Sequence, residues 1–303
     1  MFSYLILNEQ AKHMNLKLLA LVFSLFFCFT SKANHLVGGE ITYKYLGSQK
    51  FDVTFKFYRD CRGGSLISPS FKLLDVNTTK ELKLNASLVG IRDISNVCDT
   101  FTKKCNPSNK PISTSAPIFE EHVYTYQIDF NGNESSFNKV CLLKIGMGQC
   151  CRPSNLTTGG SGNDFWVTAS LNLCTAQRNS SPVFLTSPVL SLCCNQPAYF
   201  SYTAADTIDR DSLSYSLTEP MQNWFNKVDW SSSRNFKSPL EDYWPIGYDK
   251  RKGANPNVNP PIGTYFDEYD GGIIFTPTNC SEITKLAIKV IEWRKDSIGN
   301  IKL

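Results

Sequence analysis

The sequence has few of the residues on which catalysis and metal binding usually depend. Only three of its 303 residues are histidine, and no run of lysine or arginine predicts a basic groove. Nucleic acid is therefore not expected as a partner. No stretch after residue 33 is apolar enough to span a bilayer, which takes about 20 residues, so no transmembrane segment is expected in the mature chain. Disorder is not expected either, because 42% of the residues are hydrophobic and only 19% are charged.

The first 33 residues are predicted to be a signal peptide. Residues 16–29 form an apolar run interrupted only by Lys17 and Ser24, and Ser31 and Ala33 supply the small residues of a cleavage site. The mature chain is expected to begin at Asn34, and Met14 is an alternative start. A membrane anchor is the other interpretation, but the run is shorter than a bilayer requires. The protein is expected to be exported, to the extracellular space or the outer cell surface.

The cysteines predict disulfide bonds. Cys28 leaves with the leader, and an even number in an exported chain indicates pairing. Neighbours on an extended chain point to opposite sides, so adjacent cysteines are expected to bond different, distant partners. Cys280 is expected to pair with Cys193 or Cys194. Zinc is the rival interpretation, but only two histidines remain and no paired CxxC spacing occurs. The disulfide candidates are Cys61, Cys98, Cys105, Cys141, Cys150, Cys151, Cys174, Cys193, Cys194 and Cys280.

Apolar and polar residues alternate along most of the mature chain, which predicts an all-β fold of two β-sandwich-like domains stapled by disulfides. The first domain is placed at residues 34–188 and the second at 189–303, with a long aromatic- and proline-rich insertion at 221–262. No long amphipathic helix is visible. Residues 298–303 have the pattern of a new strand, so the chain is expected to be truncated at the C-terminus. The predicted strands cover residues 41–45, 51–57, 71–76, 81–89, 123–130, 140–145, 165–173, 199–202, 213–217, 271–277 and 285–290.

An acidic turn separates two of these strands. Asp206, Asp209 and Asp211 bring three carboxylates into six residues, and Ca²⁺ would neutralise them through its preference for oxygen ligands. The alternative is a solvated turn whose aspartates hydrogen-bond the local backbone.

Several blocks in order resemble the N-terminal region of large exported surface proteins of gliding Bacteroidota, which are gliding-motility-associated or adhesin-like. The blocks are residues 35–43 (HLVGGEITY), 58–61 (YRDC), 150–152 (CCR), 181–184 (SPVF), 209–215 (DRDSLSY), 272–277 (GIIFTP) and 290–294 (VIEWR). Their co-occurrence over nearly the whole mature chain carries the resemblance. It implies a cell-surface protein whose relatives continue into further repeats.

Two of these blocks also resemble the cadherin-like and immunoglobulin-like modules of bacterial surface proteins. Those modules have a D-x-D-G-D-S-L turn before one strand and G-x-I-x-F-T-P at another. Here Arg210 stands where glycine is usual, and two residues rather than one separate Asp206 from Asp209. The resemblance implies a β-sandwich for the second domain. Arg210 is a candidate to neutralise the turn alongside Ca²⁺.

The residues favour a binding or structural protein over an enzyme. A hydrolytic triad needs a histidine base near a nucleophile, and His122 lies on a strand-like segment without a G-x-S-x-G elbow. A copper-dependent enzyme using His35 and His122 would need cleavage directly before His35. Aromatic residues of the insertion could stack on sugar rings or a protein partner, or could cover an open edge of the sandwich. The ligand-binding candidates are Trp224, Trp230, Tyr243 and Trp244.

The sequence therefore predicts a non-catalytic exported cell-surface protein, an adhesion or surface-structural module associated with gliding or the cell envelope. Its expected partners are cell-surface glycans or proteins, or further domains of a longer chain. A carbohydrate-binding module of a secreted polysaccharide-processing system is the alternative function. No cofactor is expected except Ca²⁺ at the acidic turn.

Overall fold

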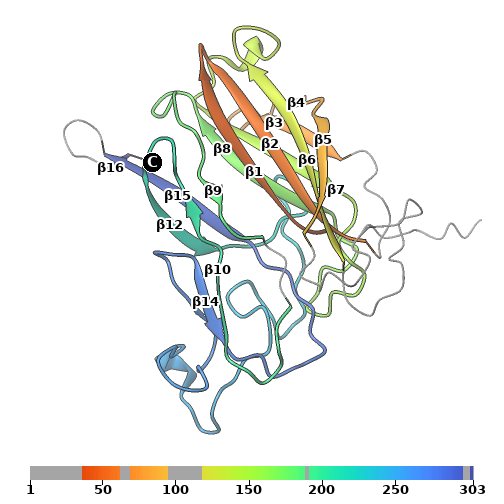
Figure 1. The fold of residues 1–303 in the computed structure, drawn as a ribbon, viewed down its shortest axis with the longest axis vertical. Coiled ribbons are helices and arrows are strands. Elements are labelled where there is room, and N and C mark those ends of the chain that lie inside the picture. Colours follow the sequence, from red (N-terminus) through yellow and green to blue (C-terminus); the bar gives the residue numbers. More distant parts are fainter. Residues whose placement is uncertain (1–35, 62–68, 95–117, 188–190, 296–300, 303) are drawn as a thin grey trace, which may run out of the picture. The chain divides into compact units, whose positions relative to one another are not determined.

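The computed structural model describes residues 36–61, 69–94, 118–187, 191–295 and 301–302 (Figure 1). The predicted leader, His35, Cys98 and Cys105 lie outside these residues. The regular secondary structure of the described residues is almost entirely β-strand, arranged in antiparallel sheets, which confirms the predicted fold class. Within it, no helix combines the length and the apolar character that crossing a membrane requires.

The first sheet has the strand order β1-β2-β6-β5. Its strands are β1 (Leu36–Gly47), β2 (Lys50–Asp60), β6 (Phe119–Asp129) and β5 (Ser87–Asp93). The predicted hairpin between the first two strands is confirmed, with Ile41 opposite Phe55. Ser48 and Gln49 form its tip with φ values of 48° and 58°. Left-handed conformations at both positions are typical of the tight turns that match strand twist.

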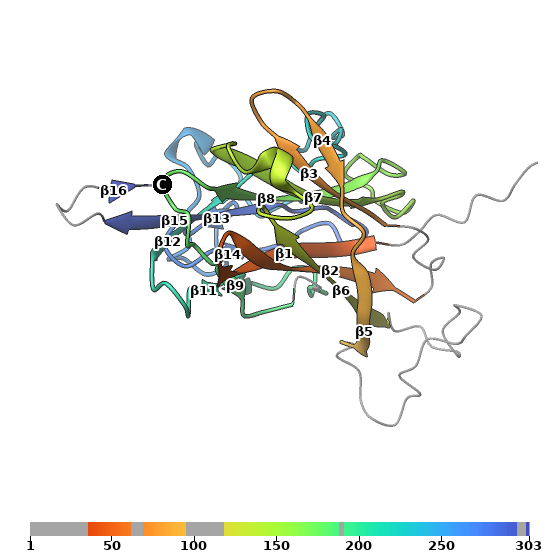
Figure 2. The ribbon, with the colours of Figure 1, turned by 90° about the horizontal axis from the view of Figure 1, so that it is seen from above.

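The second sheet has the order β4-β3-β7-β8 and lies against the first, as Figure 2 shows from above. Its strands are β4 (Glu81–Lys83), β3 (Ser70–Asp75), β7 (Leu142–Gln149) and β8 (Phe165–Asn172), and the short 3-10 helix η1 (Ser135–Phe137) precedes β7. The prediction of one strand over residues 81–89 was wrong. The chain leaves the second sheet after β4, buries Leu84 and enters the first sheet as β5. Three non-strand residues, 84–86, are enough to change sheets.

Large apolar side chains fill the space between these two sheets. The ring centroids of Phe55 and Phe71, one from each sheet, are 4.6 Å apart. Alternation along each strand places these residues on the inner face. The fully buried side chains of this core include Leu36, Phe51, Phe55, Phe57, Leu73, Phe130, Phe137, Leu143 and Ile145.

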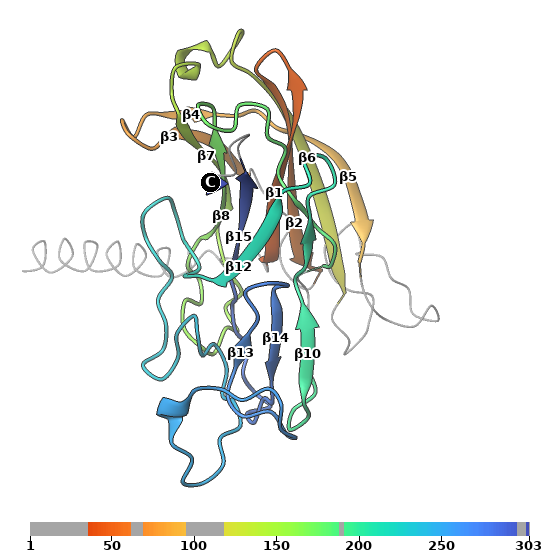
Figure 3. The same ribbon diagram turned by 90° about the vertical axis from the view of Figure 1, so that its left-hand side faces the viewer.

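The later strands form three small antiparallel sheets (Figure 3). Their orders are β10-β14-β13, β11-β9 and β12-β15-β16. A second, smaller apolar cluster centres on Ala198, Tyr202, Ile273 and Phe275. The strands are β9 (Val183–Phe184), β10 (Ala198–Ser201), β11 (Ala204–Ala205), β12 (Ser212–Leu217), β13 (Tyr265–Phe266), β14 (Gly272–Phe275), β15 (Ile288–Lys295) and β16 (Ile301–Lys302).

Residues 218–264, all described, contain only isolated bridges and the 3-10 helix η2 (Lys250–Lys252) between β12 and β13. The predicted domain boundary after residue 188 stays a prediction. Strand β9 lies before that boundary and pairs with β11, which lies after it.

Disulfide bonds close three pairs among the described cysteines. Cys141 is bonded to Cys174, and Cys194 is bonded to Cys280. The second bond is one of the two pairings expected for Cys280. Cys61 is also disulfide-bonded, whereas Cys193 is free and exposed.

The expectation of distant partners for Cys150 and Cys151 was wrong, because they bond each other. That expectation assumed an extended chain with neighbouring side chains on opposite sides. Here the two residues are joined by a cis peptide bond, and their Cα atoms are 3.1 Å apart.

Candidate functional site

The acidic turn is built around the side chain of Asp206. Its carboxylate accepts hydrogen bonds from the backbone N–H groups of Ile208, Asp209 and Asp211 at 3.2, 2.9 and 2.8 Å. An aspartate that bonds the backbone of following residues fixes a turn. The structure thus shows the local hydrogen bonding that the alternative interpretation of this turn expected.

Arg294 of β15 supplies the positive charge at this turn. Its guanidinium donates to both carboxylate oxygens of Asp211, at 2.8 and 2.6 Å, and lies 3.6 Å from Asp209. Two parallel bonds of this kind are the strongest form of an ion pair.

Arg210 was a candidate cation for this turn alongside Ca²⁺, but its side chain is exposed and makes no ion pair within the described part of the chain. Its φ of 60° instead explains why the resembling motif has glycine there.

The same carboxylates are bonded to the segment that follows the first sandwich. Asp209 accepts the backbone N–H of Ser180 at 2.6 Å, and Ser181 exchanges two hydrogen bonds of 2.8 Å with the backbone of Tyr43 in β1. Arg294 donates to the side chain of Asn179 at 2.6 Å. We call this set the polar junction: Asn179, Ser180, Ser181, Asp206, Asp209, Asp211, Glu292 and Arg294. It ties β1 to β12 and β15.

Glu292 has an unusual environment within the polar junction. Burial, together with the charges of Asp206 and Asp211, raises its pKa to about 7, although its carboxylate accepts a 2.9 Å hydrogen bond from Asn179. One oxygen each of Asp206, Asp211 and Glu292 lie within 4.8 Å of one another, a set that could hold a hard cation such as Ca²⁺. The predicted third ligand, Asp209, is not in this set. Binding of Ca²⁺ stays a prediction.

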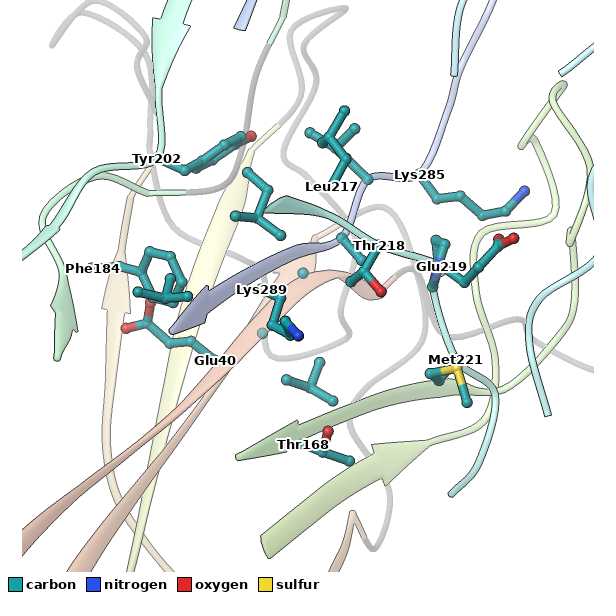
Figure 4. A pocket seen from close by; sticks show the side chains of 18 of the residues that line it. Glu40, Thr168, Phe184, Tyr202, Leu217, Thr218, Glu219, Met221, Lys285 and Lys289 are labelled. Carbon is teal, nitrogen blue, oxygen red and sulfur yellow. The ribbon is translucent and has the colours of Figure 1, made fainter. Parts of the chain in front are cut away.

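A cleft of about 1480 Å³ is lined by β1, β8, β12, β15 and the loops around them. Figure 4 shows Lys289 of β15 extending toward Thr168 of β8, while Lys285 and Glu219 lie together at another end. Apolar side chains such as Phe184 and Leu217 form much of the remaining wall. A large concave site with a few convergent polar groups is the usual form of a binding site.

Four buried or partly buried side chains lie at one end of this cleft. Two are tryptophans whose N–H groups have no acceptor in the described chain, and two are cations that donate to backbone oxygens. We call them the cationic corner: Arg152, Trp166, Trp224 and Lys285. The indole rings of Trp166 and Trp224 meet edge to face, with centroids 4.8 Å apart. Arg152 is joined to the same place because it donates to the backbone oxygen of Met221, whose backbone forms a bridge with Trp166.

The predicted aromatic ligand-binding residues do not form one exposed surface. Trp224 is buried, and Trp230 donates its N–H to Glu219 at 2.9 Å beneath the Lys285 ammonium. Trp244 is half-buried, donates to Asp242 at 2.6 Å and packs beside Tyr248. Tyr243 is half-buried and pairs its backbone with Thr276. Of the four, only Trp224 lines the cleft.

Trp166, Arg152, Lys285 and Glu292 were not predicted as site residues. Trp166 faces away from the sandwich core on β8, and the alternation of that strand could have indicated this. No local pattern marks the other three, because their partners are far away in the sequence.

His122, the histidine considered for catalysis or copper binding, is a buried residue of β6. Its ring lies 3.1 Å from the carboxylate of Glu120, which also accepts a bond from Arg59 at 3.0 Å. This arrangement gives His122 a partner within its own strand. Its proposed partner His35 lies outside the described residues.

Comparison with known proteins gives no further guide to this site. No family model, curated protein or solved structure matches the chain.

Proposed function

We propose that the protein is a non-catalytic module of the cell surface, exported by a Bacteroidota-type cell, that serves adhesion or surface structure. The polar junction is the observation that carries this proposal. Ser181, Asp211 and Arg294 belong to three of the blocks that resemble gliding-associated surface proteins, and all three make contacts within the fold. These motif residues therefore stabilise the fold, and we infer that binding takes place at other, exposed residues.

Two further features support a surface role. Disulfides persist in oxidising compartments outside the cytosol, and three pairs are closed among the described cysteines. The Tyr215 hydroxyl both donates to and accepts from the backbone of Ala204 at 3.0 Å. A tyrosine that bonds the upstream backbone is a feature of immunoglobulin-like sandwiches, which agrees with the proposed class of the second domain.

The location is tested on intact cells of the native bacterium. Antibody labelling and brief protease treatment should reach the protein without breaking the cells, and deleting its gene should reduce attachment or spreading on a surface. A protein that stays protected until lysis would contradict the surface location. Unchanged attachment of the deletion strain would contradict the adhesion role.

The second candidate function is carbohydrate binding, and the cleft with its two tryptophans favours it. Indole rings offer flat apolar surfaces with a donor group, which suits sugar rings. A glycan array probed with the purified protein tests this. Binding that is lost in the variant Trp166→Ala and kept in Trp244→Ala would support the cleft as the site. An array without any bound glycan would contradict the carbohydrate role and leave the surface role standing.

A further inference from the structure

The cationic corner contains two buried donors without acceptors in the described part of the chain. The indole N–H groups of Trp166 and Trp224 are both buried and have no hydrogen-bond partner among the described residues. Leaving a buried donor unpaired is costly, and most buried polar groups in proteins do have partners. Two such groups on neighbouring rings therefore point to an acceptor that comes from outside the chain.

Two buried cations border the same place, and no carboxylate of the described residues is in contact with either of them. Arg152 is 7% exposed, its guanidinium donates to the backbone oxygens of Asp164 and Met221, and it packs on the Phe165 ring. Lys285 is 5% exposed, donates to the backbone oxygens of Gly159 and Thr158, and lies 3.9 Å above the Trp230 ring. Neither forms an ion pair within the described residues. Buried charges without counter-charges are unfavourable unless something neutralises them.

Two acidic residues, Asp229 and Glu219, act electrostatically on Lys285, and Glu219 already has other partners. Glu219 accepts the Trp230 N–H at 2.9 Å and lies 3.6 Å from the Lys227 ammonium. Burial and the neighbouring charge of Arg152 together lower the pKa of Lys285 to about 8, although Asp229 and Glu219 oppose this. Three cations, Arg152, Lys227 and Lys285, thus face two carboxylates, Glu219 and Asp229, which leaves one positive charge in excess among these groups.

The positions of the two rings are fixed by glycines beneath them. A Cβ atom built on Gly146 would lie 2.4 Å from the Trp224 ring, and one on Gly148 would lie 2.1 Å from the Trp166 ring. The rings rest on bare backbone of β7, where any side chain would displace them. A preorganised set of donors binds better than a mobile one.

We propose that the cationic corner binds the acidic group, carboxylate or sulfate, of an acidic glycan whose sugar rings occupy the rest of the cleft. This rests on the second candidate function, carbohydrate binding. An anion would accept hydrogen bonds from the two indole N–H groups and would neutralise the charges of Arg152 and Lys285. The volume of the cleft suits several sugar rings, and Thr168, Ser170 and Thr218 line it with hydroxyl groups. Lys289, an exposed lysine of β15 without an ion pair in the described chain, would meet a second acidic substituent.

Calorimetric titration of the purified protein with defined oligosaccharides tests this. The probes are tetragalacturonic acid, its fully methyl-esterified form and a sulfated galactan tetrasaccharide. We expect an acidic probe to bind and the neutral ester to bind at least about tenfold more weakly, as expected for the loss of a charge-assisted hydrogen bond. The stronger of the two acidic probes identifies carboxylate or sulfate as the group recognised. Affinity should fall as the pH rises through about 8 and Lys285 loses its proton.

Two pairs of matched variants locate the site. Trp224→Phe keeps the ring and removes the N–H, and should weaken binding about tenfold, whereas Trp244→Phe removes an N–H that already has an acceptor and should not. Lys289→Gln should weaken binding about threefold, whereas Lys44→Gln, an exposed lysine outside the cleft, should not. Melting curves check that each variant is folded.

Each other result overturns the proposal. Equal binding of the ester and the acid would reject the anion site and keep carbohydrate binding. Binding of poly-glutamate in place of the sugars would reject both. Acidic sugars that bind equally to all four variants would place the site elsewhere, and the absence of any binding would reject the acidic glycan as ligand.

Discussion

The two regions of this molecule reach the same class of fold by different means. The described residues between 36 and 173 form two four-stranded sheets that share one aromatic core, and most of the large side chains of this core are fully buried. The described residues between 183 and 302 form sheets of two or three strands, and their main apolar cluster has four buried members. Order in the second region depends on side chains that bond the backbone two or three residues further on. These turn residues are Asn223, Asn235, Asp249, Asn255, Asp267, Asp270 and Asn279.

The difference shows that the alternation of apolar and polar residues predicts strands but does not predict which interactions stabilise them. A large core stabilises through buried area, and a small core must be supplemented by polar contacts and cross-links. The polar junction and the Cys194–Cys280 disulfide are these supplements.

Truncating one core residue in each region tests the comparison most strongly. Phe55→Ala should lower the free energy of unfolding by about 4 kcal/mol, because it leaves a large cavity in a rigid core. Phe275→Ala should cost less, about 3 kcal/mol, because the smaller cluster can collapse onto the gap. Urea denaturation measures both. A larger loss for Phe275→Ala would reverse the comparison.

Breaking the polar junction should be the next largest effect. Arg294→Gln leaves the carboxylate of Asp211, which is 6% exposed, without its cation. Because Arg294 itself is about one-third exposed, we expect a loss of about 2–3 kcal/mol rather than the full cost of a buried pair. The matched variant Arg210→Gln should change the melting temperature little. Similar effects of the two substitutions would contradict the assignment of Arg294 as the cation of the turn.

Glu292 should make stability depend on pH. Its folded pKa of about 7 lies above the ordinary 4.5, so the folded state holds a proton that the unfolded state releases. This contribution is complete below pH 4.5 and is lost as the pH rises from 4.5 to 7. Glu292→Gln should remove this decline and be the more stable protein at pH 8. Parallel stability curves for the two proteins across that range would refute the assignment.

A single turn residue should matter less. The Asn223 side chain accepts the backbone N–H groups of Phe225 and Asn226 at 2.9 and 2.8 Å. Asn223→Ala should cost about 1 kcal/mol and speed hydrogen exchange within residues 221–230. The control is Asn226→Ala, which removes the same side-chain atoms from an exposed neighbouring residue. No difference between the two would weaken the role given to these turns.

Calcium is expected to have the smallest effect, and it should depend on pH. A Ca²⁺ ion held by Asp206, Asp211 and Glu292 has to displace the proton of Glu292. Millimolar Ca²⁺ should therefore raise the melting temperature at pH 8 and not at pH 5, and Glu292→Gln should lose the response. An unchanged melting temperature at pH 8 would leave the turn purely structural.

Much of the strand pattern could be predicted, because alternation is a local property. The β1–β2 hairpin follows from residues 41–57 alone. The change of sheets after β4 could not be predicted, since one continuous apolar pattern runs through residues that end in different sheets. The Cys194–Cys280 bond was one of two expected pairings, whereas the bond between Cys150 and Cys151 contradicts the rule for extended chains.

The candidate sites were less predictable than the strands. The acidic turn is visible as three aspartates, but Glu292 and its partner Asn179 are 113 residues apart. No local sequence pattern marks Arg152 and Lys285. They are distinguished by burial without a carboxylate partner among the described residues, and this is visible only in the folded structure. Trp224 was singled out for its type, and the structure places it against Trp166.

The Cys194–Cys280 disulfide has a mechanical consequence for a chain under tension, as in the adhesion role that we propose. It closes a loop with a sequence separation of 86 residues, which contains β10 to β14 and the whole strandless insertion. Fully extended, that loop would add about 290 Å to the chain, at about 3.4 Å per residue. When the chain is pulled at its two ends, the tension passes through the sulfur atoms and bypasses the loop. The weakly packed part of the molecule is thereby shielded from stretching for as long as the bond remains oxidised.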